Sequence, residues 1–296
     1  MDQVSIVEVA PRDGLQHEPV LVSPLDRIAL IERLAEAGLA AIEAGSFVSP
    51  KVMPQMAGTG EVLHAFAGRP QLRLPVLIAT EKGLDQALAA GARDIVVAAA
   101  ASDSYSRRSL NGSIAEAIER LRPLIGRAAA AGMRVRASIS CALGCPYEGS
   151  IAVSQVVDLA EALHGLGAHE ILLADTIGVG TPGRAKALVR AVATIVPIGR
   201  LAVHFHDTYG QGLANIYAAL EEGIRTVDAA VGGLGCCTFA KGAAGNVATE
   251  DLVYMLHGLG MKTGINLEQL VEVAAWISAD LNRPLSSHVG RALRAA

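Results

Sequence analysis

Aromatic side chains are scarce in this chain: phenylalanine, tryptophan and tyrosine together make up only 3% of its 296 residues. The hydrophobic core must therefore be built mainly from alanine, valine, leucine and isoleucine. Cysteine is also rare, and the four that occur, Cys141, Cys145, Cys236 and Cys237, do not have the spacing of a structural zinc site. Because adjacent cysteines rarely pair with each other, we expect a reduced, cytoplasmic protein.

Charge blocks and long apolar runs are absent as well. The formal net charge is −4 and no cluster of basic residues occurs, so we expect neither a nucleic acid nor a membrane surface as a partner. The first residues, MDQVSIVEVA, have neither the basic region nor the long apolar region of a signal peptide. No apolar run approaches the roughly 18 residues that suggest a membrane span. No linker rich in proline or serine divides the chain, so residues 1–296 are expected to form a single domain.

Short apolar runs alternate with helical stretches along the chain. Eight runs predict strands, at residues 4–9, 40–43, 74–79, 94–99, 134–139, 170–174, 201–206 and 226–231. Ser23 and Pro24 predict a helix start, and glycines such as Gly38 and Gly91 stand where helices end. Eight strand–helix units in about 255 residues predict a (β/α)₈ barrel, with a doubly wound open sheet as the alternative. Apolar residues at helical spacing predict an additional C-terminal helix over residues 266–281.

Groups that can carry chemistry stand at the ends of five of the predicted strands. Four of these strands end in Arg12, Asp13, Glu43, Asp175, His204 and His206, and the fifth leads into the glycine-rich stretch 232–246. In a barrel of this kind the chemistry lies at the carboxyl ends of the strands, so these groups are expected to converge on one mouth. His204 and His206 are two residues apart on a strand and should point to the same side. Two neutral imidazoles suit a divalent metal, although the motif alone names neither the metal nor the reaction.

Seven motifs between residues 7 and 256 resemble those of the 3-hydroxy-3-methylglutaryl-CoA lyase family. They are VEVAPRDGLQ, IEAGSFVSPK, VSPKVMPQM, SCALGCPYEG, DTIGVGTPG, HFHDTYGQGLANI and GNVATEDLVYML. The resemblance implies a (β/α)₈ barrel that binds Mg²⁺ or Mn²⁺ and an acyl-CoA substrate. It implies cleavage of a 3-hydroxyacyl-CoA into acetyl-CoA and a keto acid, which is acetoacetate for the type substrate of the family.

The resemblance also implies roles for single residues. The metal ligands correspond to Asp13, His204, His206 and Asn246. The catalytic set corresponds to Arg12, Asp13, Glu43, His204 and Cys237, in which Arg12 meets the thioester carbonyl and Cys237 lies on a mobile loop. Asp175 and Glu250 correspond to carboxylates that support the site and join Arg12 in binding the substrate.

These residue types agree with the chemistry of carbon–carbon cleavage. A tertiary alcohol must lose its proton, and a divalent cation lowers the pKa of that hydroxyl group. Negative charge then develops on the thioester oxygen, where the permanently cationic Arg12 can receive it. The enolate must finally be protonated, and the thiol of Cys237 can deliver that proton once its loop has closed.

Four positions depart from the family pattern. Ala98 stands where the family commonly has phenylalanine, Ser138 where it has tyrosine, Ser109 where it has asparagine and Cys236 where it has glycine. The first two changes predict either compensated repacking or a roomier acyl pocket, and the sequence leaves both open.

Three other functions are alternatives to the lyase. A synthase of the same barrel group, which condenses acetyl-CoA with a 2-oxo acid, shares the Arg-Asp and His-x-His elements but typically lacks the cysteine loop. A metal-dependent amidohydrolase carries its His-x-His pair on the first strand, and a non-catalytic acyl-CoA-binding protein would show gaps in the metal set. The sequence fixes neither the substrate ester nor the metal, and we consider a homodimer as the assembly.

Overall fold

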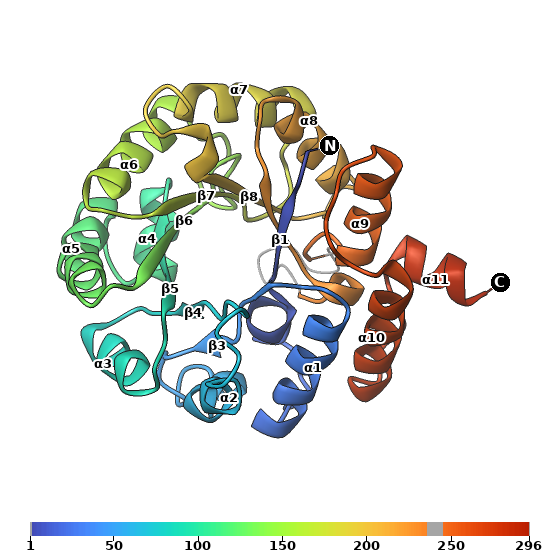
Figure 1. Ribbon diagram of the computed structural model, residues 1–296. Helices are drawn as coiled ribbons and strands as arrows, with labels where there is room; N and C mark the ends of the chain where they lie inside the picture. The colour runs from blue at the N-terminus through green and yellow to red at the C-terminus, as the bar shows by residue number, and fades with distance from the viewer. Residues whose placement is uncertain (1, 236–244, 296) are drawn as a thin grey trace.

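The computed structural model describes residues 2–235 and 245–295. One parallel sheet forms a central ring, and helices surround it (Figure 1). The strands are β1 (Ser5–Glu8), β2 (Ala41–Ile42), β3 (Gly45–Ser46), β4 (Val76–Leu77), β5 (Asp94–Ala100), β6 (Arg134–Ser140), β7 (Glu170–Asp175), β8 (Leu201–Phe205) and β9 (Thr226–Ala229). The helices are α1 (Pro24–Glu36), α2 (Thr59–Ala65), α3 (Glu81–Ala89), α4 (Asp103–Ser109), α5 (Ile114–Ala130), α6 (Val153–Gly165), α7 (Pro182–Val192), α8 (Gly212–Glu221), α9 (Thr249–Gly258), α10 (Leu267–Asp280) and α11 (His288–Arg294). Short helical turns are η1 (Ala10–Gly14), η2 (Pro54–Met56), η3 (Ile198–Arg200) and η4 (Val231–Gly233).

The sheet closes on itself because its two ends belong to one interrupted strand. The strand order is β2-β1-β9-β8-β7-β6-β5-β4-β3, and only Glu43 and Ala44 separate β2 from β3. The Glu43 amide donates to the Glu8 carbonyl at 2.8 Å, and the Ala44 amide donates to the Pro75 carbonyl at 2.9 Å. This stretch is therefore bonded to neighbours on both sides.

The predicted (β/α)₈ barrel is confirmed, and the open sheet was the wrong alternative. Each predicted strand is found within two residues of its expected ends, and only the interruption at Glu43 was not expected.

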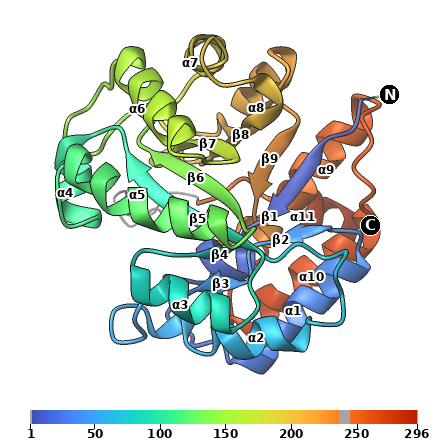
Figure 2. The same cartoon turned by 60° about the vertical axis from the view of Figure 1, so that its left-hand side comes forward.

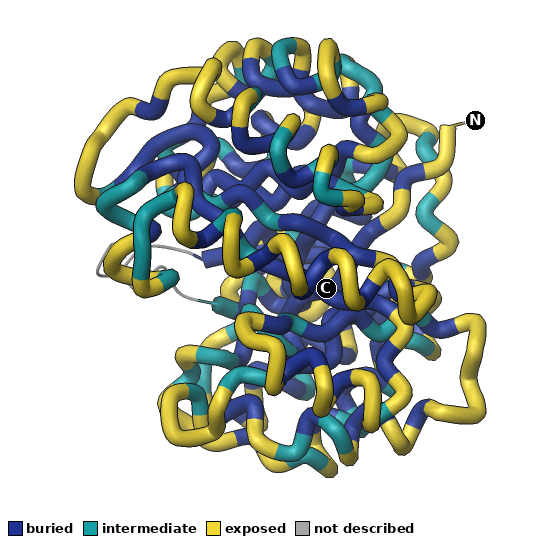
Figure 3. Tube along the Cα trace, turned by 90° about the vertical axis from the view of Figure 1, so that its left-hand side faces the viewer, coloured by how far each residue is buried: buried dark blue, intermediate teal, exposed yellow. Residues whose placement is uncertain are grey.

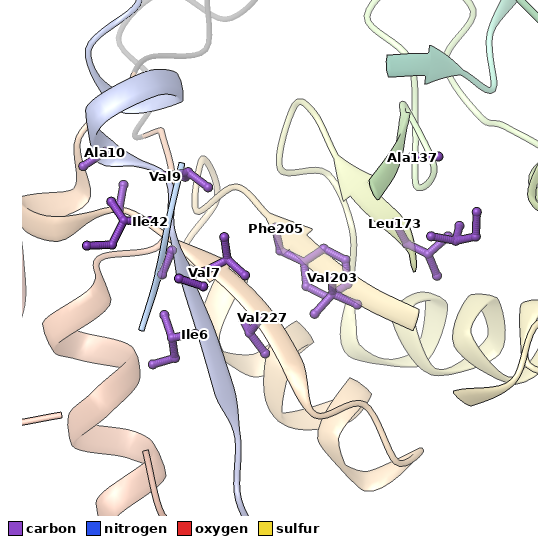
Figure 4. Packing of buried hydrophobic residues seen from close by; sticks show 14 of the residues in the cluster. Ile6, Val7, Val9, Ala10, Ile42, Ala137, Leu173, Val203, Phe205 and Val227 are labelled. Carbon is purple, nitrogen blue, oxygen red and sulfur yellow. The ribbon is translucent and has the colours of Figure 1, made fainter. Parts of the chain in front are cut away.

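Successive side chains along each strand alternate between the hydrophobic layer under the helices and the barrel interior. On β8, Val203 and Phe205 belong to the hydrophobic cluster between sheet and helices (Figure 4). His204, between them in the sequence, lines the cavity in the barrel interior. Strands β5, β6, β7 and β9 show the same alternation, with one set of side chains in the cluster and the other lining the mouth. The strands are buried, and exposed residues lie mainly on the outer helices (Figure 3). Apolar packing between the sheet and the surrounding helices therefore stabilises the barrel, and the inward-facing positions can carry polar groups.

The helix boundaries follow the predicted signals. The Ser23 side chain accepts a hydrogen bond from the Asp26 amide at the start of α1. Gly38 and Gly91 have φ angles of 103° and 76°, a region that favours glycine at helix ends. The predicted C-terminal helix is α10, which lies against α1 (Figure 2). Between these two helices the Arg33 guanidinium lies 4.6 Å from the centre of the Trp276 ring. The short helix α11 beyond it was not predicted.

Among the described residues, no helix is both long enough and apolar enough to cross a membrane.

Candidate active site

A wide helical turn after β1 carries Arg12 and Asp13 to the barrel mouth. The Gly14 amide donates to the Val9 carbonyl at 3.1 Å, and the Leu15 amide donates to the Ala10 carbonyl at 2.9 Å. Both bonds span five residues, so η1 is a single π-type turn, a conformation frequent at functional sites. Both side chains of this turn, Arg12 and Asp13, line the cavity at the mouth.

Arg12 is fixed by two carboxylates. Its Nε and Nη2 donate to the two oxygens of Glu43 at 2.8 and 2.9 Å, and its Nη1 donates to Asp13 Oδ1 at 2.8 Å. A guanidinium has five N–H donors, so two have no partner among the described residues and are available to a ligand. Burial alone would lower the pKa of Arg12, but Glu43 and then Asp13 outweigh burial and raise it. Arg12 therefore remains charged at the edge of the cavity.

Three of the predicted metal ligands converge at the mouth. One potential ligand atom from each of Asp13, His204 and His206 lies within 4.8 Å of the others, and the two imidazole centres are 5.2 Å apart. The His206 Nδ1 atom is buried and has no hydrogen-bonding partner in the described part of the chain. Two imidazoles and a carboxylate this close together, one imidazole with a buried nitrogen that lacks a partner, fit a site for a divalent cation.

Asn246 comes from the segment after the last strand and also lies at the cluster of candidate metal ligands. The Asp207 amide donates to the Gly245 carbonyl, and the Ala230 amide donates to the Val247 carbonyl, so residues 245–248 lie between the ends of β8 and β9. The Asn246 Nδ2 group donates to Asp13 Oδ2 at 2.9 Å and to the Leu234 carbonyl at 3.0 Å. Both bonds use the Nδ2 group, and within residues 2–235 and 245–295 no hydrogen bond to the amide oxygen is seen, so that oxygen can act as a hard ligand.

The pKa values of Asp13, His204 and His206 are shifted in different directions. Burial would raise the pKa of Asp13, but Arg12, with His204 and His206, outweighs burial and holds it well below its usual range. Burial and the neighbouring His204 lower the pKa of His206 to about 4, so this imidazole is neutral near pH 7. Burial would likewise lower the pKa of His204, but its hydrogen bond to Asp228 and the charge of Asp13 raise it. An ionised carboxylate and a neutral imidazole are the states that bind a metal.

A cavity of about 380 Å³ opens beside these groups. Its lining includes Arg12, Asp13 and both histidines, and on the opposite side Ala98 of β5, Ser138 of β6 and Ser109 at the end of α4. Ala98 and Ser138 are paired directly across neighbouring strands. The volume lies within the range of roughly 300–1,000 Å³ that is usual for ligand pockets.

Asp175 and Glu250 lie beside the site rather than in its lining. The Asp175 carboxylate accepts from the amides of Val179 and Gly180 at 3.2 and 2.7 Å, and so holds the loop after β7. The Glu250 carboxylate accepts from the Gly232 amide with both oxygens, at 3.1 and 3.0 Å. Through these hydrogen bonds both carboxylates hold backbone segments next to the site. Their predicted contact with the substrate stays a prediction. Cys236 and Cys237 lie outside the described residues.

Two charged residues of the barrel interior were missed by the sequence reasoning. Asp228 of β9 lies 3.3 Å from His204 Nδ1 and forms an ion pair with Arg136 of β6 at 2.6 Å. The available signal was an ionisable residue in the middle of each apolar strand, at the inward position of the alternation.

Comparison with known proteins agrees with this geometry. A sequence model of the HMGL-like family matches residues 3–277. The chain is 51% identical over 290 residues to the mitochondrial hydroxymethylglutaryl-CoA lyase of Mus musculus, over 98% of this chain and 89% of that protein. The crystal structure of hydroxymethylglutaryl-CoA lyase from Pseudomonas aeruginosa gives a TM-score of 0.97 at 48% identity, over 99% of this chain and 98% of that one.

A second solved structure contains ligands. It is an HMG-CoA lyase from Acinetobacter baumannii in complex with coenzyme A and 3-methylmalate, with a TM-score of 0.93 and 36% identity over 98% of this chain and 95% of that one. The sequence match and the structural match both extend over nearly the whole chain. The chain therefore belongs to the HMGL-like family.

Proposed function

We propose that this protein is a carbon–carbon lyase that uses a divalent cation to cleave 3-hydroxy-3-methylglutaryl-CoA, or a closely related 3-hydroxyacyl-CoA, into acetyl-CoA and a keto acid. The observation that carries the proposal is the convergence of Asp13, His204 and His206 within 4.8 Å at a cavity that Arg12 also lines. Relatives that bear the name of this lyase, one of them holding coenzyme A, support the choice of substrate class.

The reaction removes one proton from an oxygen atom of the substrate, breaks one carbon–carbon bond and returns one proton to a carbon atom. The tertiary hydroxyl group of the substrate loses its proton, its electron pair forms the new carbonyl group, and the bond between C2 and C3 breaks. The electrons of that bond pass to the thioester as an enolate, which is protonated at C2. A divalent cation bound at this site supplies Lewis-acid chemistry, which lowers the pKa of the substrate hydroxyl group. We propose that Asp13, His204, His206 and Asn246 hold this cation.

The protein's own groups account for the remaining requirements. The two N–H donors of Arg12 that have no partner among the described residues can bind the thioester oxygen, where negative charge develops during cleavage. Glu43 holds the guanidinium in a fixed plane through two hydrogen bonds, so little reorganisation is needed as that charge appears. We assign the final proton transfer to Cys237, on the motif that carries it.

We propose Mg²⁺ or Mn²⁺ as the cation. The donor set combines two imidazoles with a carboxylate and an amide oxygen, and it leaves coordination positions for substrate oxygens. Hard oxygen donors favour these ions over softer metals, and no described cysteine belongs to the cluster of candidate ligands.

An activity screen tests the proposed function. A set of 3-hydroxyacyl-CoA esters is incubated with the protein and Mg²⁺ or Mn²⁺, and acetyl-CoA and keto acids are measured by mass spectrometry. We expect equal amounts of acetyl-CoA and acetoacetate from 3-hydroxy-3-methylglutaryl-CoA. Condensation of acetyl-CoA with a 2-oxo acid, without cleavage of any ester, would instead identify a synthase.

Cys237→Ser should retain metal and fold but lose most turnover, because a hydroxyl group is a far weaker acid than a thiol. Cys236→Gly is the matched control, since it changes the neighbouring cysteine to the residue common in the family, and it should be tolerated. Turnover and bound metal are measured for both variants. If Cys236 is essential and Cys237 dispensable, the two roles must be exchanged.

Ala98 and Ser138 should permit substrates with a larger alkyl group at C3. The two small side chains adjoin in the cavity, and burial of each additional methylene group there could contribute about 0.8 kcal/mol. The kcat/KM values for 3-methyl and longer 3-alkyl substrates should therefore favour the longer group. Ala98→Phe should shift the preference back towards methyl. A clear preference of the unmodified protein for methyl would instead indicate compensated repacking.

We propose a reducing compartment for this protein. Both described cysteines outside the motif at 236–237, Cys141 and Cys145, are free thiols, which supports a reducing compartment such as the cytoplasm. We propose a single catalytic domain over residues 1–296, and a homodimer as the assembly, for which mass measurement in solution is the test.

A further inference from the structure

A buried chain of charged side chains continues from the candidate metal site into the barrel. His204 Nδ1 lies 3.3 Å from Asp228 Oδ2, and Asp228 Oδ1 lies 2.6 Å from an Nη2 atom of Arg136. Arg136 Nε donates in turn to the carboxylate of Glu170. Asp228 and Arg136 are only 3% and 6% exposed, so bulk water does not screen these interactions. Neither residue belongs to the ligand set proposed above.

We propose that Asp228 is a positioning residue that fixes His204 in the tautomer required for metal binding, and that Arg136 fixes the orientation of Asp228. This inference rests on the proposed metal site. A carboxylate only accepts hydrogen bonds, so His204 must carry its proton on Nδ1 to bond with Asp228. The lone pair then lies on Nε2, the atom that faces Asp13 Oδ2 at 3.9 Å. A ligating histidine commonly has its second nitrogen fixed by a carboxylate in this way.

The role of Arg136 follows from its donors. A guanidinium cannot accept a hydrogen bond, so whatever atom faces it at position 228 must be an acceptor. In Asp228→Asn the amide oxygen should therefore stay with Arg136, and the NH₂ group should turn to His204. The imidazole then has to accept on Nδ1 and carry its proton on Nε2, where the metal should bind. We expect this isosteric change to weaken Mn²⁺ binding about 10- to 100-fold.

Removal of the guanidinium should reverse the effect. In the double variant Asp228→Asn with Arg136→Gln, no donor holds the amide oxygen, so the amide can turn and accept from His204 Nδ1. Mn²⁺ affinity should recover by several-fold relative to the single variant. A change in charge alone would also predict some recovery, so the tautomer must be observed directly.

The experiment therefore combines two readouts. Mn²⁺ affinity is measured by electron paramagnetic resonance, and the tautomer of His204 by long-range ¹H–¹⁵N spectra of the Mg²⁺-loaded protein, with His204→Gln used for assignment. We expect Nδ1–H in the unmodified protein, Nε2–H in Asp228→Asn and Nδ1–H again in the double variant. Asp94→Asn is the matched control, because Asp94 is a buried carboxylate that pairs with Arg73 and does not line the cavity at the mouth. It should alter stability without altering either readout.

The outcomes separate this inference from the proposed function. Absence of Mn²⁺ and Mg²⁺ binding by the unmodified protein would contradict the metal site and this inference with it. Normal binding with His204 protonated on Nε2 in the unmodified protein would overturn the inference alone, and this result needs no variant that folds. Unchanged affinity in Asp228→Asn, or no return of the Nδ1–H tautomer in the double variant, would also overturn it.

Discussion

His204→Ala should lose bound divalent metal and catalytic activity together. The imidazole lies with Asp13 and His206 in the one cluster of candidate ligands found among the described residues, and the remaining groups would leave the cation with an incomplete set of donors. We expect less than about a hundredth of the activity, because cleavage of the substrate depends on the lowered pKa of its hydroxyl group. Elemental analysis and turnover are measured on the same preparations.

The control for this variant is His64→Ala. His64 is exposed on α2, where its Nδ1 atom is hydrogen-bonded to the Gly60 carbonyl, so its loss should change neither metal content nor turnover. A His204→Ala protein that keeps a full equivalent of metal would remove His204 from the proposed ligand set. Absence of divalent metal from the unmodified protein, even after loading with Mg²⁺ or Mn²⁺, would contradict the whole site.

Arg12→Gln should lower kcat by about 10²-fold or more and change KM little. The guanidinium meets a negative charge that develops fully only during cleavage, so its contribution belongs mainly to the transition state. Glutamine is neutral and shorter, and it would also leave the buried Glu43 without the partner that binds both of its oxygens. Steady-state kinetics with saturating metal separate kcat from KM.

Arg73→Gln provides the comparison for Arg12. Arg73 also donates two hydrogen bonds to a carboxylate, that of Asp94, but it lies at the other end of the barrel and outside the cavity. It should reduce stability modestly and leave kcat near that of the unmodified protein. If kcat/KM falls in Arg12→Gln only because KM rises, with kcat unchanged, Arg12 binds the substrate without stabilising the transition state.

The sequence predicted those parts of the site that depend on local periodicity. The spacing of His204 and His206 requires a common direction once the strand is recognised, and the structure brings both to the mouth. Arg12, Asp13 and Glu43 were placed at strand ends, and the barrel brings strand ends together.

Contacts between distant parts of the chain could not be derived from periodicity. Asn246 reaches Asp13 only because residues 245–248 lie between two strands, and that path depends on tertiary hydrogen bonds. The pairing of Asp228 with Arg136 is likewise invisible in either strand alone. The interruption at Glu43 also arises from three-dimensional closure, since this stretch must bond to neighbours on both sides of the barrel.

The central claim is that cleavage of the acyl-CoA depends on a divalent cation held at this site. The most direct measurement treats the protein with a chelator, removes the chelator, and follows acetyl-CoA and acetoacetate formation from 3-hydroxy-3-methylglutaryl-CoA while Mg²⁺ is added back. We expect no product without metal, and equimolar products in proportion to the ion bound, with saturation at one ion per chain. Undiminished cleavage by the metal-free protein, or no cleavage by the fully loaded protein, would contradict this claim.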